Sequence, residues 1–136
     1  MDEVAFKFEK YKFTKASLNF DIPGNATFDI GFMPKGTLFQ NEGRFELAFD
    51  TLIECKETNT PVIAVSCEAS FIFTNNVTKE DIPNYFYPNS LAIIFPYIRA
   101  FVSTLSLQAN IPPVILPTIN LMGITDELRN KTIVKE

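Results

Sequence analysis

Apolar and polar residues alternate through much of the first half of the chain, which is the pattern of strands that bury one face of a sheet. Phe45, Leu47 and Phe49 alternate with charged or small neighbours. Residues 62–74 repeat this pattern, and residues 13–22 and 28–32 have the same spacing. We therefore predict four antiparallel strands with one face packed and the other in water.

Interruptions of the alternation predict turns and one irregular strand. The spacing of apolar residues shifts by one position between Phe13 and Leu18, which indicates a β-bulge or a bend. Clusters of Pro, Gly and Asn at residues 23–25, 34–36 and 41–43 predict turns. The polar residues 57–61 predict a loop between the last two strands.

The second half of the chain has a different pattern, because residues 87–122 carry a single charge, that of Arg99. Apolar residues recur at helical spacing from Leu91 to Leu105, and Asn89 is placed to cap this helix. Pro96 lies inside it and removes a backbone donor, so we expect a kink or a restarted helix there.

The segment that follows is rich in proline. Residues 110–122 contain three prolines, which exclude a helix and predict an extended, apolar strap. A short helical turn at residues 79–82 and a short helix at residues 125–131 complete the pattern. Strands are followed by helix, strap and helix with no internal repeat, so we interpret residues 1–136 as one α+β domain.

Charge and composition narrow the classes of partner. The net charge is −4, and Lys7, Lys10, Lys12 and Lys15 have acidic residues among them, so we expect no nucleic-acid partner. The first residues lack the features of a secretory signal, and no uninterrupted apolar run approaches the roughly 20 residues of a membrane span. We therefore expect a cytoplasmic protein that is not membrane-embedded.

The residue types needed for catalysis or metal binding are scarce. The chain has no His and two cysteines, so we predict no metal site and no cofactor. Cys67 precedes Glu68, but neighbours in a strand point to opposite faces and would not meet. Cys55 and Cys67 could face each other across a hairpin, and whether they pair stays open. We expect a protein that is not an enzyme.

The uncharged stretch has two interpretations. It could be a core helix and connection buried within one subunit. Apolar residues on several sides of the helix, followed by the strap, favour self-association and a remaining binding groove instead.

Three motifs in this stretch resemble the helix-and-lid region of the SecB family of export chaperones. They are Tyr87-Pro88-Asn89, Phe95-Pro96-Tyr97-Ile98-Arg99 and the proline-rich run at residues 111–121. Residues 13–23 and 67–74 are similar to the first and fourth strands of that family. The resemblance implies a four-stranded antiparallel sheet followed by a long helix, a proline-rich strap and a short C-terminal helix. It also implies a homo-oligomer, either a dimer or a dimer of dimers (homotetramer).

The resemblance further implies an ATP-independent holdase that binds unfolded polypeptides or preproteins for export and has SecA as a partner. Carried over by position, the client-binding residues would be Phe101, Leu105, Ile111, Val114, Leu116, Ile119 and Leu121, and Phe residues of the sheet would complete the groove. Asp21 and Glu68 are the candidates for SecA docking, whereas Ser17 stands where the family usually has an acid. Two alternatives stay open: a SecB-like chaperone dedicated to an antitoxin or other single partner, and an adaptor of the same fold without chaperone activity.

Overall fold

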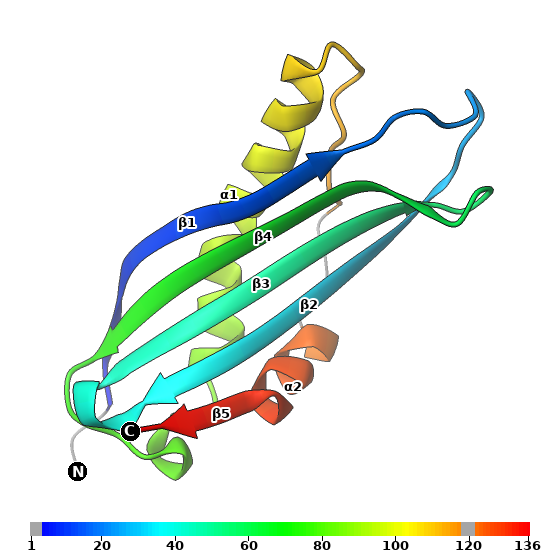
Figure 1. Ribbon diagram of the computed structural model, residues 1–136. Helices are drawn as coiled ribbons and strands as arrows, with labels where there is room; N and C mark the ends of the chain where they lie inside the picture. Colours follow the sequence, from blue (N-terminus) through cyan, green and yellow to red (C-terminus); the bar gives the residue numbers. More distant parts are fainter. Residues whose placement is uncertain (1–3, 118–121) are drawn as a thin grey trace.

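The computed structural model describes residues 4–117 and 122–136. A curved sheet forms one layer, α1 crosses one of its faces, and α2 lies beside β2 and β5 (Figure 1). The elements in chain order are β1 (Phe6–Leu18), β2 (Phe28–Phe39), η1 (Gln40–Glu42), β3 (Arg44–Cys55), β4 (Thr60–Phe73), η2 (Lys79–Asp81), α1 (Phe86–Gln108), α2 (Met122–Asn130) and β5 (Thr132–Lys135). The α+β class is confirmed.

The sheet has five strands in the order β1-β4-β3-β2-β5. Strands β1 to β4 are antiparallel, as predicted, but β5 pairs in parallel with the end of β2. The prediction of a four-stranded, purely antiparallel sheet is therefore wrong. β5 was missed because four residues are too few for an alternating pattern to be recognised.

The two faces of the sheet differ sharply in composition. We call the face that α1 covers the inner face and the opposite one the outer face. In β3 every inner residue is buried, whereas every outer residue is partly exposed. Outer positions carry charges such as Arg44, Glu46 and Asp50. The alternation seen in the sequence reflects this difference.

β1 needs two irregularities to keep its apolar residues on the inner face. The register with β4 shifts between Phe8 and Lys10, and again between Phe13 and Lys15. The second shift confirms the predicted bulge; the first was not predicted. Each bulge inserts one residue, so apolar residues spaced by two, three, two, three and two all reach the same face. These residues are Phe6, Phe8, Tyr11, Phe13, Ala16 and Leu18.

The turn predicted at residues 34–36 is wrong, because β2 continues through it. Pro34 is tolerated there because β5 pairs only from Gly36 onward, so β2 is an edge strand at Pro34. Gly36 is required by packing, since a Cβ atom at this position would collide with the ring of Phe45. The turn predicted at residues 41–43 is confirmed, and Gly43 adopts φ 61° there.

α1 begins three residues before its predicted cap. Phe86 and Tyr87 are buried and already helical, so Asn89 lies inside the helix. Of the two outcomes expected at Pro96, the restart is excluded because the helix runs through this residue, whereas the kink stays a prediction. Pro96 and Ala92 lie on the exposed side, where water can bond to the carbonyl group that the proline leaves free.

Aromatic rings fix the start of α1 against the sheet. The ring of Phe86 is fully buried, and its centroid lies 4.8 Å from that of Phe6 and 4.8 Å from that of Phe45. The rings of Phe71 and Phe73 lie 5.6 and 4.9 Å away. Most of these contacts are edge-to-face, the arrangement that aromatic quadrupoles favour.

By length and composition alone, α1 could cross a membrane. The expectation that the chain has no segment long and apolar enough for a membrane span is therefore too strong. Core helices of globular proteins pass the same test. Here Leu91, Ile94, Ile98 and Val102 are fully buried in the core that α1 shares with the sheet.

The remaining boundaries differ by a few residues. η2 confirms the helical turn near residues 79–82. α2 starts at Met122, within the predicted strap, and residues 112–117 have no regular secondary structure. Cys55 and Cys67 are free. Cys67 lies opposite Phe49, six residues or about 20 Å along β3 from Cys55, too far for a disulfide.

Packing at Gly36 gives a test of this architecture. We expect Gly36→Ala to lower the free energy of unfolding by about 1–3 kcal/mol, because the added methyl group displaces the ring of Phe45. Gly31→Ala, in the same strand but with nothing within 4 Å of its Cβ position, is the control. Urea unfolding would measure both, and equal stability of the two variants would contradict the packing described here.

Candidate functional site

An open groove lies at the end of the inner face farthest from Phe86. It has a volume of about 610 Å³. Its walls are the β1–β2 connection, the start of β2 and the segment that follows α1. The lining residues are Phe20, Ile22, Pro23, Gly24, Ala26, Phe28, Ile30, Ile53, Ile111, Pro112, Pro113, Val114 and Ile115.

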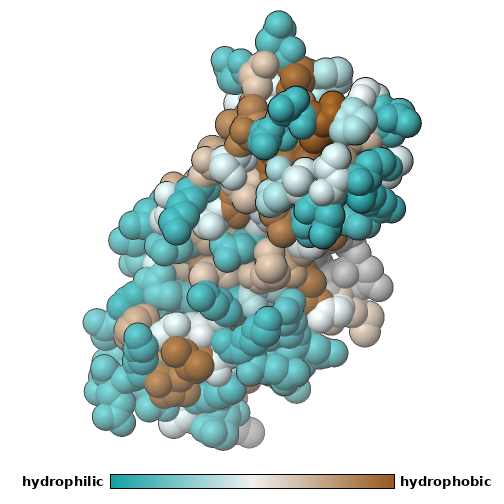
Figure 2. Space-filling model, turned by 45° about the vertical axis from the view of Figure 1, so that its right-hand side comes forward, coloured by the Kyte–Doolittle hydropathy of each residue, from teal (hydrophilic) through white to brown (hydrophobic). Residues whose placement is uncertain are grey.

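None of the groove's described lining residues has a polar side chain, and several are substantially exposed. Phe28 is 38% exposed, Ile30 37% and Ile115 66%. Figure 2 shows apolar surface among hydrophilic residues in its upper part, at the height where the β1–β2 connection and the end of α1 lie in Figure 1, and a further apolar patch near the bottom. Such a surface can bind apolar groups, and none of its described lining residues has a side chain that could act on a substrate.

Two serines of α1 hold one wall of the groove in place. The hydroxyl group of Ser106 accepts a hydrogen bond from the Val114 N–H at 2.8 Å. The hydroxyl group of Ser103 donates one to the Val114 carbonyl group at 3.0 Å. These residues are one helical turn apart and bind both backbone polar groups of Val114, as a neighbouring strand would. We call this arrangement the serine clamp.

A carboxylate holds the opposite wall. Glu57, in the β3–β4 turn, accepts hydrogen bonds from the Thr27 N–H at 2.8 Å and from the Thr27 hydroxyl group at 2.7 Å. Thr27 lies between Ala26 and Phe28, which both line the groove. The bond from the backbone N–H, followed by that from the hydroxyl group, lowers the pKa of Glu57 from 4.5 to about 2.

The client-binding residues predicted from the sequence do not form one surface. Ile111 and Val114 line the groove. Phe101 stacks on Phe13, with ring centroids 4.0 Å apart, and lines a separate depression of about 270 Å³. Leu105 is half-buried against the core, and Leu116 is fully buried within it.

The assignments at Ile119 and Leu121 lie outside the described residues. No residue of the β1–β2 connection or of β2 was predicted by number to line the groove, although Phe residues of the sheet were expected to complete it. The alternation of Phe28 and Ile30 next to a Pro-Gly turn was the available signal, but alternation alone does not show which part of a face a helix leaves uncovered.

The two SecA-docking candidates lie apart. Asp21 is exposed beyond the end of β1, and its N–H donates to the Asn19 side chain at 3.0 Å. Glu68 lies midway along β4 on the outer face, 4.0 Å from Lys12. Lys12 is six residues from the end of β1, so about 20 Å of strand separates the two sites.

The groups considered for catalysis are not arranged for it. Cys67 is buried, and desolvation, followed by the charge of Glu68, raises the pKa of its thiol to about 11. A thiol with this pKa is protonated at neutral pH and is a poor nucleophile. Among the described residues, no group of three or more Cys, Asp or Glu side chains could hold a metal ion.

The serine clamp makes a testable prediction about the groove wall. We expect Ser103→Ala/Ser106→Ala to speed hydrogen exchange of the Val114 amide about 5- to 30-fold, the effect of losing two hydrogen bonds of about 0.5–1 kcal/mol each. Ser90→Ala removes a hydroxyl group that bonds to Tyr87 in the same helix and is the control. Unchanged exchange at Val114 in the double variant would show that the clamp does not hold this wall.

The bonds of Glu57 predict a dependence of stability on pH. A folded-state pKa of about 2, below the unfolded value near 4.5, stabilises the fold above pH 4.5, and this contribution is lost as pH falls toward 2. We expect Glu57→Gln to be less stable at neutral pH and to lose less stability on acidification. Urea midpoints across this range would measure both effects. Glu54→Gln removes a carboxylate that has no bond to Thr27, and a matching pH profile in that variant would refute the assignment.

Comparison with known proteins places this fold and groove in context. The model of the family described as preprotein translocase subunit SecB matches residues 19–131. An uncharacterized protein of Methanocaldococcus jannaschii, MJ0357, is 64% identical over 36 residues, which are 26% of this chain and 23% of that protein. The matched segment thus spans under a quarter of this relative's length.

Among solved structures, the fold is similar to that of the Mycobacterium tuberculosis Rv1957 SecB-like chaperone, in complex with a ChAD peptide from the Rv1956 HigA1 antitoxin. The TM-score is 0.70 at 16% identity, over 85% of this chain and 88% of that one. The family match spans most of the chain, and the fold agrees with it. The chain therefore belongs to the SecB family.

Proposed function

We propose that this protein is a molecular chaperone that holds unfolded polypeptides in the groove without using ATP. The observation that carries the proposal is the open apolar groove. Its described lining residues have apolar side chains, and Phe28, Ile30 and Ile115 among them are exposed. Membership of the SecB family supports the same function. In this proposal the protein binds its client and does not act on it chemically.

The physical basis is the removal of apolar surface from water. Each Å² of apolar surface that client and groove bury together contributes about 25 cal/mol. This interaction has no directional requirement, so side chains of different shapes can occupy the same groove. Held in this way, an unfolded chain exposes less apolar surface to other unfolded chains and aggregates less.

Dedication to one partner is the second candidate. The similar Mycobacterium tuberculosis structure is in complex with an antitoxin peptide, which supports a polypeptide occupant but comes from a protein that is only 16% identical. A dedicated chaperone would hold its own partner and fail with unrelated clients. Tests with several clients separate the two candidates.

We further propose a cytoplasmic homo-oligomer, a dimer or a dimer of dimers, assembled through the exposed side of α1. Tyr97 is 40% exposed and Leu107 59% exposed on this helix, so association would cover apolar surface there. We also propose that the residues carried over by resemblance bind the client. We propose in addition that SecA docks at Asp21 and Glu68. Leu116 would become accessible only if residues 111–117 moved, because it is fully buried.

Suppression of aggregation tests the holding function. A chemically unfolded client would be diluted into buffer with the protein, and light scattering would be followed. We expect the wild type to suppress scattering and Ile30→Asp and Ile115→Asp to lose most of this effect, because a charged group in the groove opposes apolar burial. Several unrelated clients would be compared.

The matched control is Ile133→Asp. Ile133 is 54% exposed but lies in β5, which pairs with the opposite end of β2 from the groove. A soluble, folded wild type that suppresses no aggregation would refute the holding function. Suppression that survives both groove substitutions would place client binding elsewhere.

A further inference from the structure

The outer face of β1 carries a row of four lysines that the sequence does not reveal. Lys7, Lys10, Lys12 and Lys15 are spaced by three, two and three positions, which would scatter them over both faces of a regular strand. In the register with β4 they lie opposite Ile72, Ser70, Glu68 and Ser66, which are successive outer residues. The two bulges therefore bring all four to one face. We call them the lysine row.

The row is regular in space although it is irregular in sequence. Its partners are every second residue of β4, so successive lysines lie about 6.7 Å apart along the sheet. This is the spacing of alternate residues in an extended chain. The register leaves Glu9 and Thr14 unpaired. These two inserted residues give the lysines their regular spacing on one face.

Most of the row forms no ion pair with the described residues, although Glu9 lies between Lys7 and Lys10 in the strand. All four lysines are exposed, and Lys12 has the row's single ion pair among the described residues, at 4.0 Å with Glu68. Glu46 is nearby, but it accepts hydrogen bonds from Ser70 at 2.9 Å and from Arg44. Its charge is therefore already paired with a cation on its own strand.

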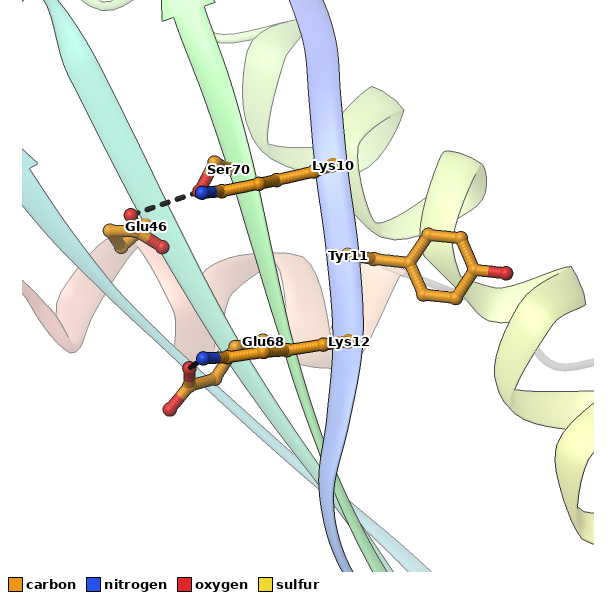
Figure 3. Close-up of a pocket in the computed structure, with 6 residues that line it drawn as sticks. All are labelled: Lys10, Tyr11, Lys12, Glu46, Glu68 and Ser70. Atoms are coloured by element: carbon orange, nitrogen blue, oxygen red, sulfur yellow. Dashed lines mark hydrogen bonds and ion pairs between the residues drawn. The ribbon is translucent and has the colours of Figure 1, made fainter.

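Figure 3 shows how the row meets the sheet. Lys10 and Lys12 reach across the outer face toward Ser70 and Glu68, whereas Tyr11 between them points to α1 on the inner face. These residues border a shallow depression of about 160 Å³ together with Glu46. The two central lysines of the row thus border a surface hollow over which a chain could lie.

We propose that the lysine row binds an acidic, extended segment of a partner polypeptide, with carboxylates at alternate positions. Carboxylates spaced by two residues in an extended chain recur at the interval of the lysines, so each can meet one ammonium group. The row lies on the face opposite the groove, so an acidic partner and a groove occupant can be bound at the same time.

The spacing and the surrounding charges favour this partner over the alternatives. The acids on the outer face of β3 are Glu46, Asp50 and Glu54, which recur every fourth residue and would match only every second lysine of another copy. These acids also repel a long polyanion that extends beyond β1, which disfavours nucleic acid. A short acidic peptide over β1 stays one strand away from Asp50 and Glu54, and Glu46, which borders the hollow, is already paired with Arg44.

Peptide binding tests the proposal on the full chain. The probes are fluorescent peptides of eight residues, one alternating Glu and Thr and one with the four Glu in a block, measured by polarisation in about 20 mM salt. We expect the alternating peptide to bind about threefold more tightly or better. We expect Lys10→Glu/Lys12→Glu to weaken its binding about tenfold.

The matched control is Lys35→Glu/Lys135→Glu, which changes the net charge equally through exposed lysines of β2 and β5. Lys10→Ala/Lys12→Ala should weaken binding in the same direction and serves if charge reversal perturbs folding. Equal affinity for the two peptides, or equal losses in row and control variants, would overturn the proposal. It would also be overturned by tighter binding of a single-stranded oligonucleotide, or by a change of oligomeric state in the row variants alone.

Discussion

Phe86 packs among the rings of four phenylalanines of the sheet, and the placement of the helix and of the groove depends on this contact. It fixes the start of α1 over one end of the sheet. From that point the 23 residues of α1 rise about 34 Å at 1.5 Å per residue, whereas the 14 residues of β4 extend about 46 Å. α1 is shorter than β4 and also crosses the strands instead of following them (Figure 1), so it leaves the far end of the inner face for other segments to cover or to stay open.

The chain leaves that end partly open and holds both sides of the opening by polar contacts. Hydroxyl groups of α1 bind Val114 on one side, and the carboxylate of Glu57 binds Thr27 on the other. None of these polar side chains is among the described residues that line the groove. The polar side chains are used to position the walls, and the described side chains that line the groove are apolar. This division suits a surface that receives apolar groups of many shapes.

Local patterns predicted the parts of the fold in which each residue's environment follows from its neighbours. Phe45, Leu47 and Phe49 gave β3, and the phase shift after Phe13 gave one of the bulges. Contacts between residues distant in sequence could not be predicted from local patterns. Gly36 was interpreted as a turn residue, although its lack of a side chain accommodates Phe45 from the neighbouring strand.

The groove shows the same limit. The resemblance placed Ile111 and Val114 at a binding surface, and both line the groove. Ile30 was predicted to be a strand residue without a site, and no particular Phe of the sheet was assigned to the groove, because exposure there depends on where α1 ends over the sheet. Leu116, chosen for its place in the strap, is buried because the clamp holds Val114 close to α1. Such facts depend on tertiary distances that no single segment encodes.

The paired bulges of β1 have a consequence for how this strand can change. Loss of Glu9 or Thr14 would remove a residue that the register leaves unpaired, so β1 would become more regular and every other residue would keep its face. Loss of a paired residue such as Lys7 would instead exchange the facing of the residues before it, and Phe6 would turn from the aromatic cluster to solvent. Single-residue deletions in β1 should therefore be tolerated at the two bulges and be rare at the paired positions.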